Sequence, residues 1–480
     1  MEKPYRTDPT YAWVHLPIAL FPAIRATLLG LFSFAVLVAA ITAKPARTLS
    51  DFDQSFYLTI AYDLNHHGVF SNGVFDGVDS TREVPPPGMF FVPGYPLVVL
   101  AAMKLDARFA KAAECTVINQ EKEAAGCEPY EIPIRIIHAA LLALGVVAIA
   151  LAGSIIFASA RLFWIAGVLA TTGLAAEADI FSFVMTESLT FSLYSVTMVF
   201  AALAWKRGNT MWWGLTGLLL GLLCLTRPSF VVLVPGVLLL IAAGSRLLAA
   251  KTRPSAWKSA AVFVTVVGLT IGPWILRNHV SVGKWGLTEE YGSAVLIERF
   301  AYNDMNPMEF VTAFPYCTPG LGDLLFDQVY GRDSMHRFVY HTRNSFFHVG
   351  RGRRDMLVSE HGRLDPLIRD VVRDEMRTNW WRHLLVSIPL AWCGMWAGWI
   401  VALALLPLFA CASVRAIQKR EPVLLLYAAP AIMMLGLHGA VANHYTRYNL
   451  ILIGPAAIGA AWMISAWLQH ARLRWLAPER

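Results

Sequence analysis

Charged residues are scarce in this sequence. They make up 15% of the 480 residues, whereas hydrophobic residues make up 56%. In soluble domains roughly a quarter of the residues are charged, so the composition excludes a water-soluble enzyme. Internal repeats and low-complexity tracts are also absent. Their absence disfavours a transporter built from inverted repeats.

Long apolar stretches are abundant instead. A helix of roughly 20 apolar residues crosses the hydrocarbon layer of a membrane. Ten stretches approach that length, at about 24–43, 133–157, 163–180, 186–205, 211–226, 229–245, 259–276, 384–410, 422–441 and 449–468. Thr226, Arg227 and Pro228 divide residues 211–245 and predict a tight hairpin there. Residues 1–23 lack an apolar core followed by a small-residue cleavage site, so we expect the first span to be a retained anchor.

Basic residues gather on one side of the predicted membrane. With both termini cytoplasmic, the inner segments carry 16 basic and 4 acidic residues. The loop at about 45–132 carries 6 basic and 12 acidic residues, and the loop at about 277–383 carries 14 of each. This positive-inside pattern places both long loops outside. The net charge of +7 is therefore an inner-face excess and does not indicate a nucleic-acid partner.

The six cysteines divide between loops and spans. Cys115, Cys127 and Cys317 fall in the outward loops, where oxidation is expected. A Cys115–Cys127 disulfide would pin residues 106–131, but spacing alone does not fix the Cα geometry, so the pairing stays open. The other three, Cys224, Cys393 and Cys411, lie in predicted spans and are expected to be inert packing residues.

The first outward loop begins with a helical pattern. Apolar residues at 52, 56, 57, 60, 61 and 64 predict a short amphipathic helix on the membrane surface that ends near Gly68. Asp51 and Asp53 stand at its start. They either cap the helix or hold a carboxylate where lipid-borne substrates arrive.

Residues 82–96 cannot form a regular helix throughout, because five prolines remove hydrogen-bond donors and favour extended backbone. At membrane depth such backbone needs protein cover or a wet cavity. The segment is therefore interpreted either as a stiff apolar wall beside a pocket or as a connector that does not contact substrate.

Six features in this order resemble the GT-C glycosyltransferases of the protein mannosyltransferase, aminoarabinose transferase and galacturonosyltransferase-like kind. They are Asp53 and Tyr57 with Ala61, the Pro86–Pro96 pattern of a double proline followed by Tyr-Pro, Thr186-Glu187-Ser188-Leu189, Gly217 through Pro228 (GLLLGLLCLTRP), Pro273-Trp274-Ile275-Leu276-Arg277-Asn278, and Arg447-Tyr448. The resemblance covers nearly the whole chain, and only residues 277–383 lack a match. It implies an all-α GT-C-like membrane protein that uses a polyprenyl-phosphate sugar as donor.

The resemblance also implies roles for individual residues. Asp53 matches the aspartate assigned as the general base, which takes the proton from the acceptor hydroxyl as that hydroxyl attacks the anomeric carbon. The phosphate leaving group needs electrostatic stabilisation, for which arginines at outer span ends are suited. The alternative for these arginines is snorkelling to the interface. The predicted substrate contacts are, with Arg277 as the first choice, Arg277, Arg447, Arg227, Arg82, Glu83, Tyr57, Glu187, Asp51 and Tyr95.

Two departures from the aminoarabinose transferases concern basic contacts. Those enzymes have a glutamate and a nearby arginine after the aspartate, where this chain has Gln54 and Phe56. Their lysine before the double proline is Val84 here, although the preceding Glu83 is retained. Arg82 is the candidate substitute for one missing contact. The departures leave the sugar open but do not change the reaction class.

We expect no cofactor. The spacing of Asp51 and Asp53 suits one divalent cation, but the similar enzymes are thought to work without a metal at this aspartate. Glu187 either caps its helix or contacts the sugar. The histidines, including His66, His67, His438 and His444, are expected to be satisfied hydrogen-bonding groups rather than metal ligands.

The second outward loop carries interleaved charges from Asp355 to Arg382 that predict a solvated amphipathic helix. Trp380 and Trp381 at its end suit an interfacial belt. Three regions follow from the pattern: a transmembrane module at 1–276 that includes the first loop, an outward loop at 277–383, and C-terminal spans at 384–480.

The sequence therefore predicts an inverting membrane glycosyltransferase in the bacterial inner membrane, with its active site on the periplasmic face. It would move a sugar from a polyprenyl phosphate to a lipid, glycan or protein acceptor, as in cell-envelope glycan or lipid A modification, and it would contact membrane lipids but no nucleic acid. The alternatives are a transporter or lipid flippase, and an O-antigen ligase or polymerase.

Overall fold

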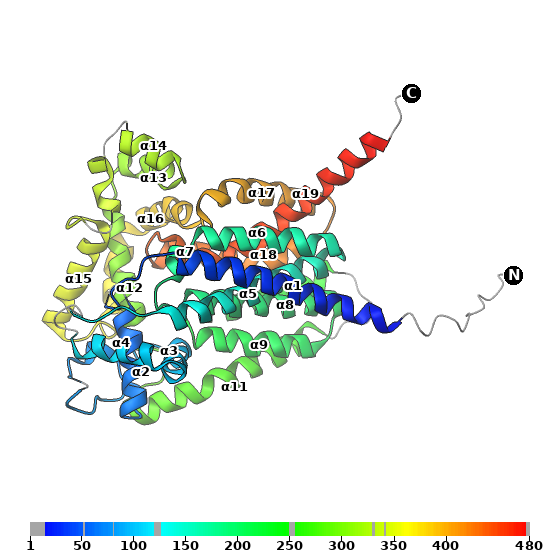
Figure 1. The fold of residues 1–480 in the computed structure, drawn as a ribbon. Coiled ribbons are helices and arrows are strands. Elements are labelled where there is room, and N and C mark those ends of the chain that lie inside the picture. Colours follow the sequence, from blue (N-terminus) through cyan, green and yellow to red (C-terminus); the bar gives the residue numbers. More distant parts are fainter. Residues whose placement is uncertain are drawn as a thin grey trace.

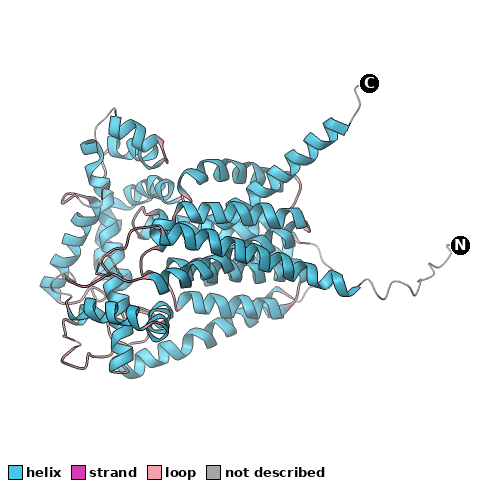
Figure 2. Ribbon diagram, in the orientation of Figure 1, coloured by secondary structure: helices cyan, strands magenta, loops and turns pink. Residues whose placement is uncertain are grey.

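The computed structural model describes residues 15–50, 53–79, 81–119, 126–248, 255–328, 332–339 and 342–476. Within these residues the regular structure is entirely helical (Figure 2). Eight helical segments are long and apolar enough to cross a membrane. The chain is therefore a multi-pass membrane protein, as the sequence predicted.

The long helices run side by side in one bundle (Figure 1). They are α1 (His15–Thr42), α5 (Ile132–Phe157), α8 (Glu187–Arg207), α10 (Leu233–Leu247, with the preceding turn Pro228–Val232), α11 (Ala256–Val282), α17 (Ala402–Gln418), α18 (Pro422–Val441) and α19 (Ile453–Leu476). Two shorter apolar helices, α6 (Ala160–Ala176) and α9 (Thr210–Cys224), pack among them. The predicted break at Thr226, Arg227 and Pro228 is confirmed, because α9 ends at Cys224 and α10 begins at Leu233.

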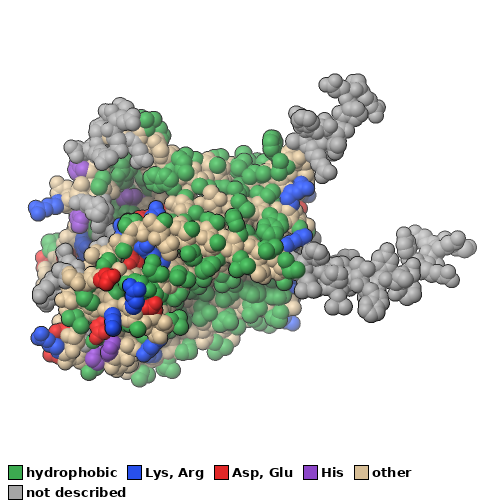
Figure 3. All heavy atoms as spheres, viewed as in Figure 1, with side chains coloured by type: hydrophobic (Ala, Val, Ile, Leu, Met, Phe, Trp, Pro, Cys, Tyr) green, Lys and Arg blue, Asp and Glu red, His purple; other side chains and the backbone are tan. Residues whose placement is uncertain are grey.

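The remaining helices gather at one end of this bundle, opposite the end where α1 begins (Figure 1). They are α2 (Gln54–His66), α3 (Gly94–Leu105), α4 (Ala107–Ile118), α12 (Tyr291–Phe300), α13 (Pro307–Cys317), α14 (Leu321–Gln328), α15 (Phe346–His361) and α16 (Ile368–Gly394), with the one-turn α7 (Ala178–Phe181) in the connection between α6 and α8. Charged side chains of both signs gather over this end, whereas the flank of the bundle is mainly hydrophobic (Figure 3). We call it the polar end.

The predicted span at 384–410 is wrong as a single helix. Helix α16 ends at Gly394, and α17 begins at Ala402 after a bend. Gly398 in the bend has φ +97°, a left-handed conformation that glycine adopts without steric cost. Its N–H donates to the buried Glu177 carboxylate at 2.8 Å. The apolar run therefore divides between two helices.

The predicted helix from Asp355 to Arg382 is also wrong as one element. Helix α15 ends at His361 because Gly362 takes φ +76° and caps it in the left-handed conformation. Helix α16 then begins at Ile368. Charge periodicity continues through this break, so charge periodicity alone did not reveal it.

The first outward loop follows the sequence prediction more closely. Helix α2 spans Gln54–His66, and Gly68 follows it with φ +67°. Much of α2 is buried, and it packs against α3 and α4. The proline-rich segment is non-helical as far as Pro93, but Pro96 lies in the first turn of α3, where proline is tolerated.

Four of the six cysteines form two disulfides. Cys115 joins Cys127, which resolves the pairing that the sequence left open. Cys317 joins Cys393, so the prediction that Cys393 is an inert packing residue is wrong. Cys393 lies in the last turn of α16, and the disulfide joins it to Cys317, the last residue of α13 at the polar end.

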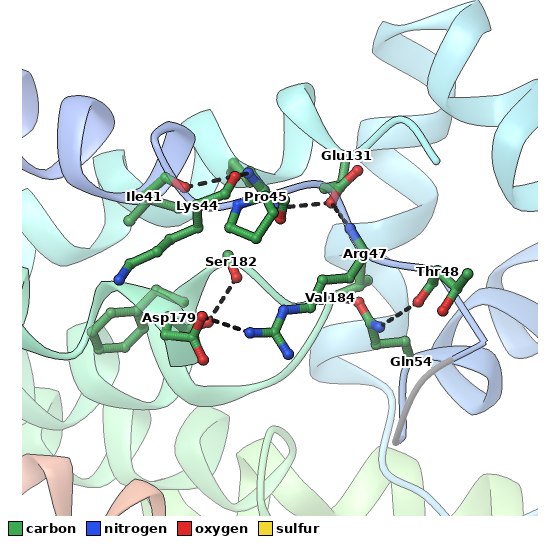
Figure 4. Close-up of polar contacts among 12 residues, drawn as sticks. Ile41, Lys44, Pro45, Arg47, Thr48, Gln54, Glu131, Asp179, Ser182 and Val184 are labelled. Atoms are coloured by element: carbon green, nitrogen blue, oxygen red, sulfur yellow. Dashed lines mark hydrogen bonds and ion pairs between the residues drawn. The ribbon is translucent and has the colours of Figure 1, made fainter. Parts of the chain in front are cut away.

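A buried ion pair between Glu131 and Arg135 holds the crossing from α1 to α2. Figure 4 labels Glu131 and the residues of the crossing around it. Arg135 on α5 bonds the Glu131 carboxylate at 2.8 Å and also donates to the carbonyls of Lys44 at 2.7 Å and Pro45 at 2.8 Å. The same Glu131 oxygen accepts the backbone N–H of Arg47 at 3.0 Å. Carbonyl groups that emerge from the end of α1 are thereby satisfied.

The crossing is also tied to the connection before α8 (Figure 4). The Arg47 guanidinium pairs with Asp179 at 2.8 Å and lies over the ring of Phe183. The Gln54 side chain donates to the Thr48 carbonyl at 3.2 Å and accepts the Val184 N–H at 2.8 Å. Asp53, immediately before Gln54, is therefore positioned by contacts to α5 and to residues 179–184.

Replacing Arg135 with methionine should destabilise the fold strongly. The change leaves Glu131 charged, buried and without its ion-pair partner, and breaking a buried pair in this way typically costs about 3–5 kcal/mol. Unfolding in detergent, followed by circular dichroism, measures the loss. Arg82→Gln breaks an exposed pair with Asp79 and should change stability little. Equal effects of the two changes would contradict this role of Arg135.

Candidate functional site

A cavity of about 510 Å³ opens at the polar end. Six separate parts of the chain form its walls: the start of α2, the proline-rich segment, residues 180–185 before α8, helices α12 and α15, and residues 443–448. Its lining residues are Asp53, Phe56, Phe90, Phe91, Ile180, Phe183, Met185, Tyr291, Ala294, Val295, Glu298, Phe347, Arg351, Arg354, Asn443, Tyr445, Thr446, Arg447 and Tyr448. Aromatic and aliphatic side chains dominate this set, with a few charged groups among them.

Asp53 directs its carboxylate to the cavity rather than to its helix. It occupies the N-cap position of α2, yet its side chain makes no capping hydrogen bond. The side chain is 45% exposed and faces Arg447, with 3.6 Å between Asp53 Oδ2 and Arg447 Nη2. The capping alternative is therefore not realised for Asp53. Asp51, its predicted partner, lies outside the described residues.

Arg447 stands in the turn Thr446–Leu452 that leads into α19. Its guanidinium donates to the Met185 sulfur at 3.1 Å and to the Tyr448 hydroxyl at 3.3 Å. It also lies 5.1 Å from the centroid of the Tyr448 ring. These weak contacts orient the group without neutralising its charge, so Asp53 is its main electrostatic partner.

A smaller hollow of about 30 Å³ also includes Asp53 in its lining. Arg227 lines this hollow, with its guanidinium 3.7 Å from Glu187 and 4.8 Å from the Tyr448 ring centroid. Arg227 and Arg447 thus approach the same aromatic ring. The buried Glu187 has one carboxylate oxygen without a hydrogen-bond partner in the described structure. Asp53 and Tyr448 line both hollows, with Arg447 in the larger one and Glu187 and Arg227 in the smaller one.

The two predicted tyrosines have different surroundings. Tyr57 lines the smaller hollow, and burial, followed by the nearby charge of Asp53, raises the pKa of its hydroxyl well above the ordinary value. Its ring meets that of Tyr95 edge-on. Tyr95 is fully buried, bonds His138 at 2.9 Å, and lines neither hollow.

Arg277, the first choice from the sequence for a phosphate contact, lies elsewhere. Its guanidinium donates to the Gly88 carbonyl and, at 2.8 Å, to the Phe70 carbonyl. It also lies 5.0 Å from the Trp274 ring centroid, and it lines neither hollow. These contacts make Arg277 a clamp on the proline-rich segment, whose next residues, Phe90 and Phe91, form a cavity wall.

Two further predicted contacts are on the outer surface. Arg82 is 82% exposed and pairs with Asp79 at 3.2 Å. Glu83 beside it is exposed as well. Neither residue lines the cavity or the smaller hollow.

Three charged residues of the cavity were not among the sequence predictions. Glu298 on α12 is 7% exposed and pairs with Arg354 on α15 at 2.6 Å. Arg351, one turn earlier on α15, lines the same wall. Spacing of three residues places both arginines on one helix face, but no pattern in the sequence indicates that this face lines the same cavity as Asp53.

Carboxylates outside the cavity form a cluster with ligand atoms within 4.8 Å of one another: Glu289, Glu290 and Asp365. Glu290 accepts the N–H of Leu364 at 2.5 Å, and Asp365 accepts the N–H of Glu290 at 2.9 Å. Glu289 pairs with Lys284 at 2.8 Å. These carboxylates therefore join the start of α12 to the α15–α16 turn.

The histidine prediction is confirmed where contacts are resolved. His438 bonds the Asn449 side chain at 2.9 Å, and His444 bonds the Tyr302 hydroxyl at 3.1 Å. His66 contacts the Tyr62 carbonyl at 3.1 Å. Each of these three histidines has a hydrogen-bonding partner within the protein.

The sequence matches no protein-family model, and a search of curated proteins gives no match. The resemblance to glycosyltransferases therefore stays a prediction.

Stability should depend on pH through Glu298. Burial raises the pKa of its carboxyl from 4.5 to about 7, against the opposing attraction of Arg354. The folded chain holds this proton where the unfolded chain has lost it, so stability falls as pH rises from about 4.5 to about 7. Glu298→Gln removes this titration.

Unfolding temperatures in detergent across that range measure the effect. The unfolding temperature of Glu298→Gln, relative to that of the unmodified protein, should rise as pH rises and level off above about pH 7. Glu360→Gln, at an exposed position on α15, is the control and should parallel the unmodified protein. A constant difference for Glu298→Gln would contradict the assignment.

Proposed function

We propose that this chain is an inverting, GT-C-type glycosyltransferase that transfers a sugar from a polyprenyl phosphate to an acceptor hydroxyl. The observation that carries the proposal is the pairing of Asp53 with Arg447 in a cavity at the polar end of an apolar bundle. A base and a phosphate-binding cation beside each other are what transfer from a sugar phosphate requires.

Asp53 acts as the general base. Its carboxylate is accessible in the cavity and is not engaged in helix capping. It removes the proton from the acceptor hydroxyl while the oxygen attacks the anomeric carbon. The bond from that carbon to the phosphate oxygen breaks on the opposite face, which inverts the configuration. Polyprenyl phosphate leaves with the bonding electrons.

Arg447 and Arg227 stabilise the leaving phosphate. Both guanidinium groups gather around Tyr448, and both are permanently charged and suited to bidentate contact with phosphate oxygens. The negative charge on the departing phosphate grows in the transition state, so a cation held in place lowers the barrier. Glu187, with its free carboxylate oxygen in the smaller hollow, is positioned to accept a sugar hydroxyl.

The apolar part of the cavity suits a lipid-linked substrate. Phe56, Phe90, Phe91, Phe183 and Met185 line it next to the charged groups. A polyprenyl chain can therefore approach from the bundle side while its phosphate reaches Arg447. The proline-rich segment, clamped by Arg277, supplies the stiff wall that was one interpretation of its sequence.

The proposed setting is the inner membrane of a bacterium, with the polar end in the periplasm and about ten spans. The asymmetry of basic residues supports this orientation. Both disulfides lie at the polar end, and disulfides persist in oxidising compartments such as the periplasm. Reaction on this face would serve cell-envelope glycan or lipid A modification.

A ligase or polymerase of lipid-linked glycans is the second candidate. It is favoured by α12 and α15, which belong to the second outward segment and line the cavity. Such an enzyme would depend on residues of that segment and not on Asp53. The two candidates therefore differ in their response to one substitution.

Asp53→Asn should abolish most of the transfer. Loss of a general base typically lowers the rate by about 10²–10⁴-fold, and the half-exposed side chain contributes little to stability. Release of polyprenyl phosphate from a radiolabelled lipid-linked sugar pool in proteoliposomes measures turnover. Asp79→Asn, an exposed aspartate in the same loop, is the matched control. Undiminished transfer by Asp53→Asn would exclude the base assignment and favour the second candidate.

Arg447→Gln should mainly affect transfer, whereas Arg277→Gln should mainly affect stability. The first removes charge from the cavity and should slow transfer by roughly 10²–10³-fold while the unfolding temperature changes little. The second releases the carbonyls of Phe70 and Gly88 and should lower the unfolding temperature. Turnover and thermal unfolding of each purified variant are compared. The reverse pattern would assign the contact with the donor phosphate to Arg277 instead of Arg447.

A further inference from the structure

Helix α15 presents one face to the cavity. Phe347, Arg351 and Arg354 on this helix all line it, at the i, i+4 and i+7 spacing of a single helical face. None of the three has a part in the proposed chemistry of the donor. The α15 face forms part of the cavity wall contributed by the second outward segment, whereas Arg447 and Arg227 belong to turns at the ends of the bundle helices.

The charges of the cavity are not fully paired. Arg447 faces Asp53, and Arg354 is held by Glu298 at 2.6 Å and by Asp355 at 2.7 Å. Arg351 makes no ion pair with a carboxylate within 4.0 Å in the part of the chain that the structure describes. Its guanidinium lies 5.9 Å from the Phe347 ring centroid. Arg351 thus brings an exposed positive charge to the cavity, and its attraction to Glu298, which helps to lower the pKa of that carboxyl, acts without a direct ion pair.

The chemistry of this pair limits what it would bind. A guanidinium presents a planar set of donors that matches a carboxylate or a phosphate with two parallel hydrogen bonds. Glu298 and Asp355 bond all three guanidinium nitrogens of Arg354, which leaves one further N–H on each terminal nitrogen. Both arginines line the same cavity wall. A neutral sugar would provide no negative charge to form an ion pair with Arg351.

We propose that Arg351, with Arg354 beside it, is a binding site for an anionic group, phosphate or carboxylate, on the acceptor. This inference rests on the proposed function and specifies its acceptor. The donor phosphate would occupy Arg447 and Arg227, and the acceptor anion would occupy the α15 face. Two separate cationic sites in one cavity would orient the acceptor hydroxyl toward Asp53, because the acceptor would be held away from its reacting oxygen.

Protection from an arginine reagent tests this site without turnover. The full chain in neutral phosphatidylcholine nanodiscs is treated with phenylglyoxal, and labelling at each arginine is measured by mass spectrometry. Glucose 6-phosphate and glucuronate are the anionic probes, and glucose is the neutral one. At a probe concentration of about ten times its Kd, labelling of Arg351 should slow roughly tenfold. Glucose should give no protection.

Arg353 on the same helix provides an internal control. It pairs with Asp304 at 2.5 Å and does not line the cavity, so the probes should leave its labelling unchanged. In Arg354→Gln the protection of Arg351 should weaken, while Arg353→Gln should keep it. Protection by glucose 6-phosphate alone would identify a phosphate, and protection by glucuronate alone a carboxylate.

Three results would overturn the proposal. They are equal labelling of Arg351 with and without the anionic probes, equal protection by glucose, and protection of Arg351 by polyprenyl phosphate added alone, which would assign α15 to the donor. The measurement uses neither donor nor transfer. Its failure would therefore leave Asp53-dependent transfer intact, whereas loss of the proposed function would appear as full transfer by Asp53→Asn.

Discussion

The buried pair of Glu131 and Arg135 is the constraint on which the polar end depends. A chain that leaves a membrane helix must satisfy the carbonyls at its end before it turns. Arg135 satisfies those of Lys44 and Pro45, and Glu131 holds the following backbone through Arg47. Because Gln54 then bonds Val184, the start of α2 and the start of α8 share one framework. Asp53, proposed to take the acceptor proton, precedes α2, and Glu187, proposed to bind a sugar hydroxyl, begins α8.

Much of this architecture follows from local pattern. The length of the apolar stretches predicted the positions of most bundle helices, and Pro228 predicted the break after α9. The helical spacing of apolar residues after Asp53 predicted α2. Prediction failed where an apolar or charged run continued through a bend. Gly398 and Gly362 break the 384–410 and 355–382 runs in left-handed conformations. The bend at Gly398 also involves a tertiary partner, because its N–H bonds Glu177, which lies far away in sequence. Gly362 caps α15 locally, within a run of charges that continues past it.

The candidate site was predictable only in part for the same reason. Motif order pointed to Asp53, Arg227 and Arg447, and these residues do gather in space. Arg277 is also an arginine at the end of a predicted span. Its guanidinium, however, donates to the Phe70 carbonyl and does not line the cavity. The contribution of α12 and α15 was hidden, because a run of alternating charges has the same pattern whether its face meets water or a cavity. Only long-range packing distinguishes the two.

The Cys317–Cys393 disulfide has a consequence for how the α15 wall can vary. It closes a covalent ring of 76 residues in sequence that contains α14, α15 and nearly all of α16. Both ends of this ring are fixed to the bundle end, so extra residues within it add only slowly to the entropy of closure. A single backbone cut inside the ring would leave both pieces joined to the rest of the chain. The wall opposite Asp53 can therefore change in length and sequence, and with it the proposed acceptor site, while the membrane bundle stays as it is.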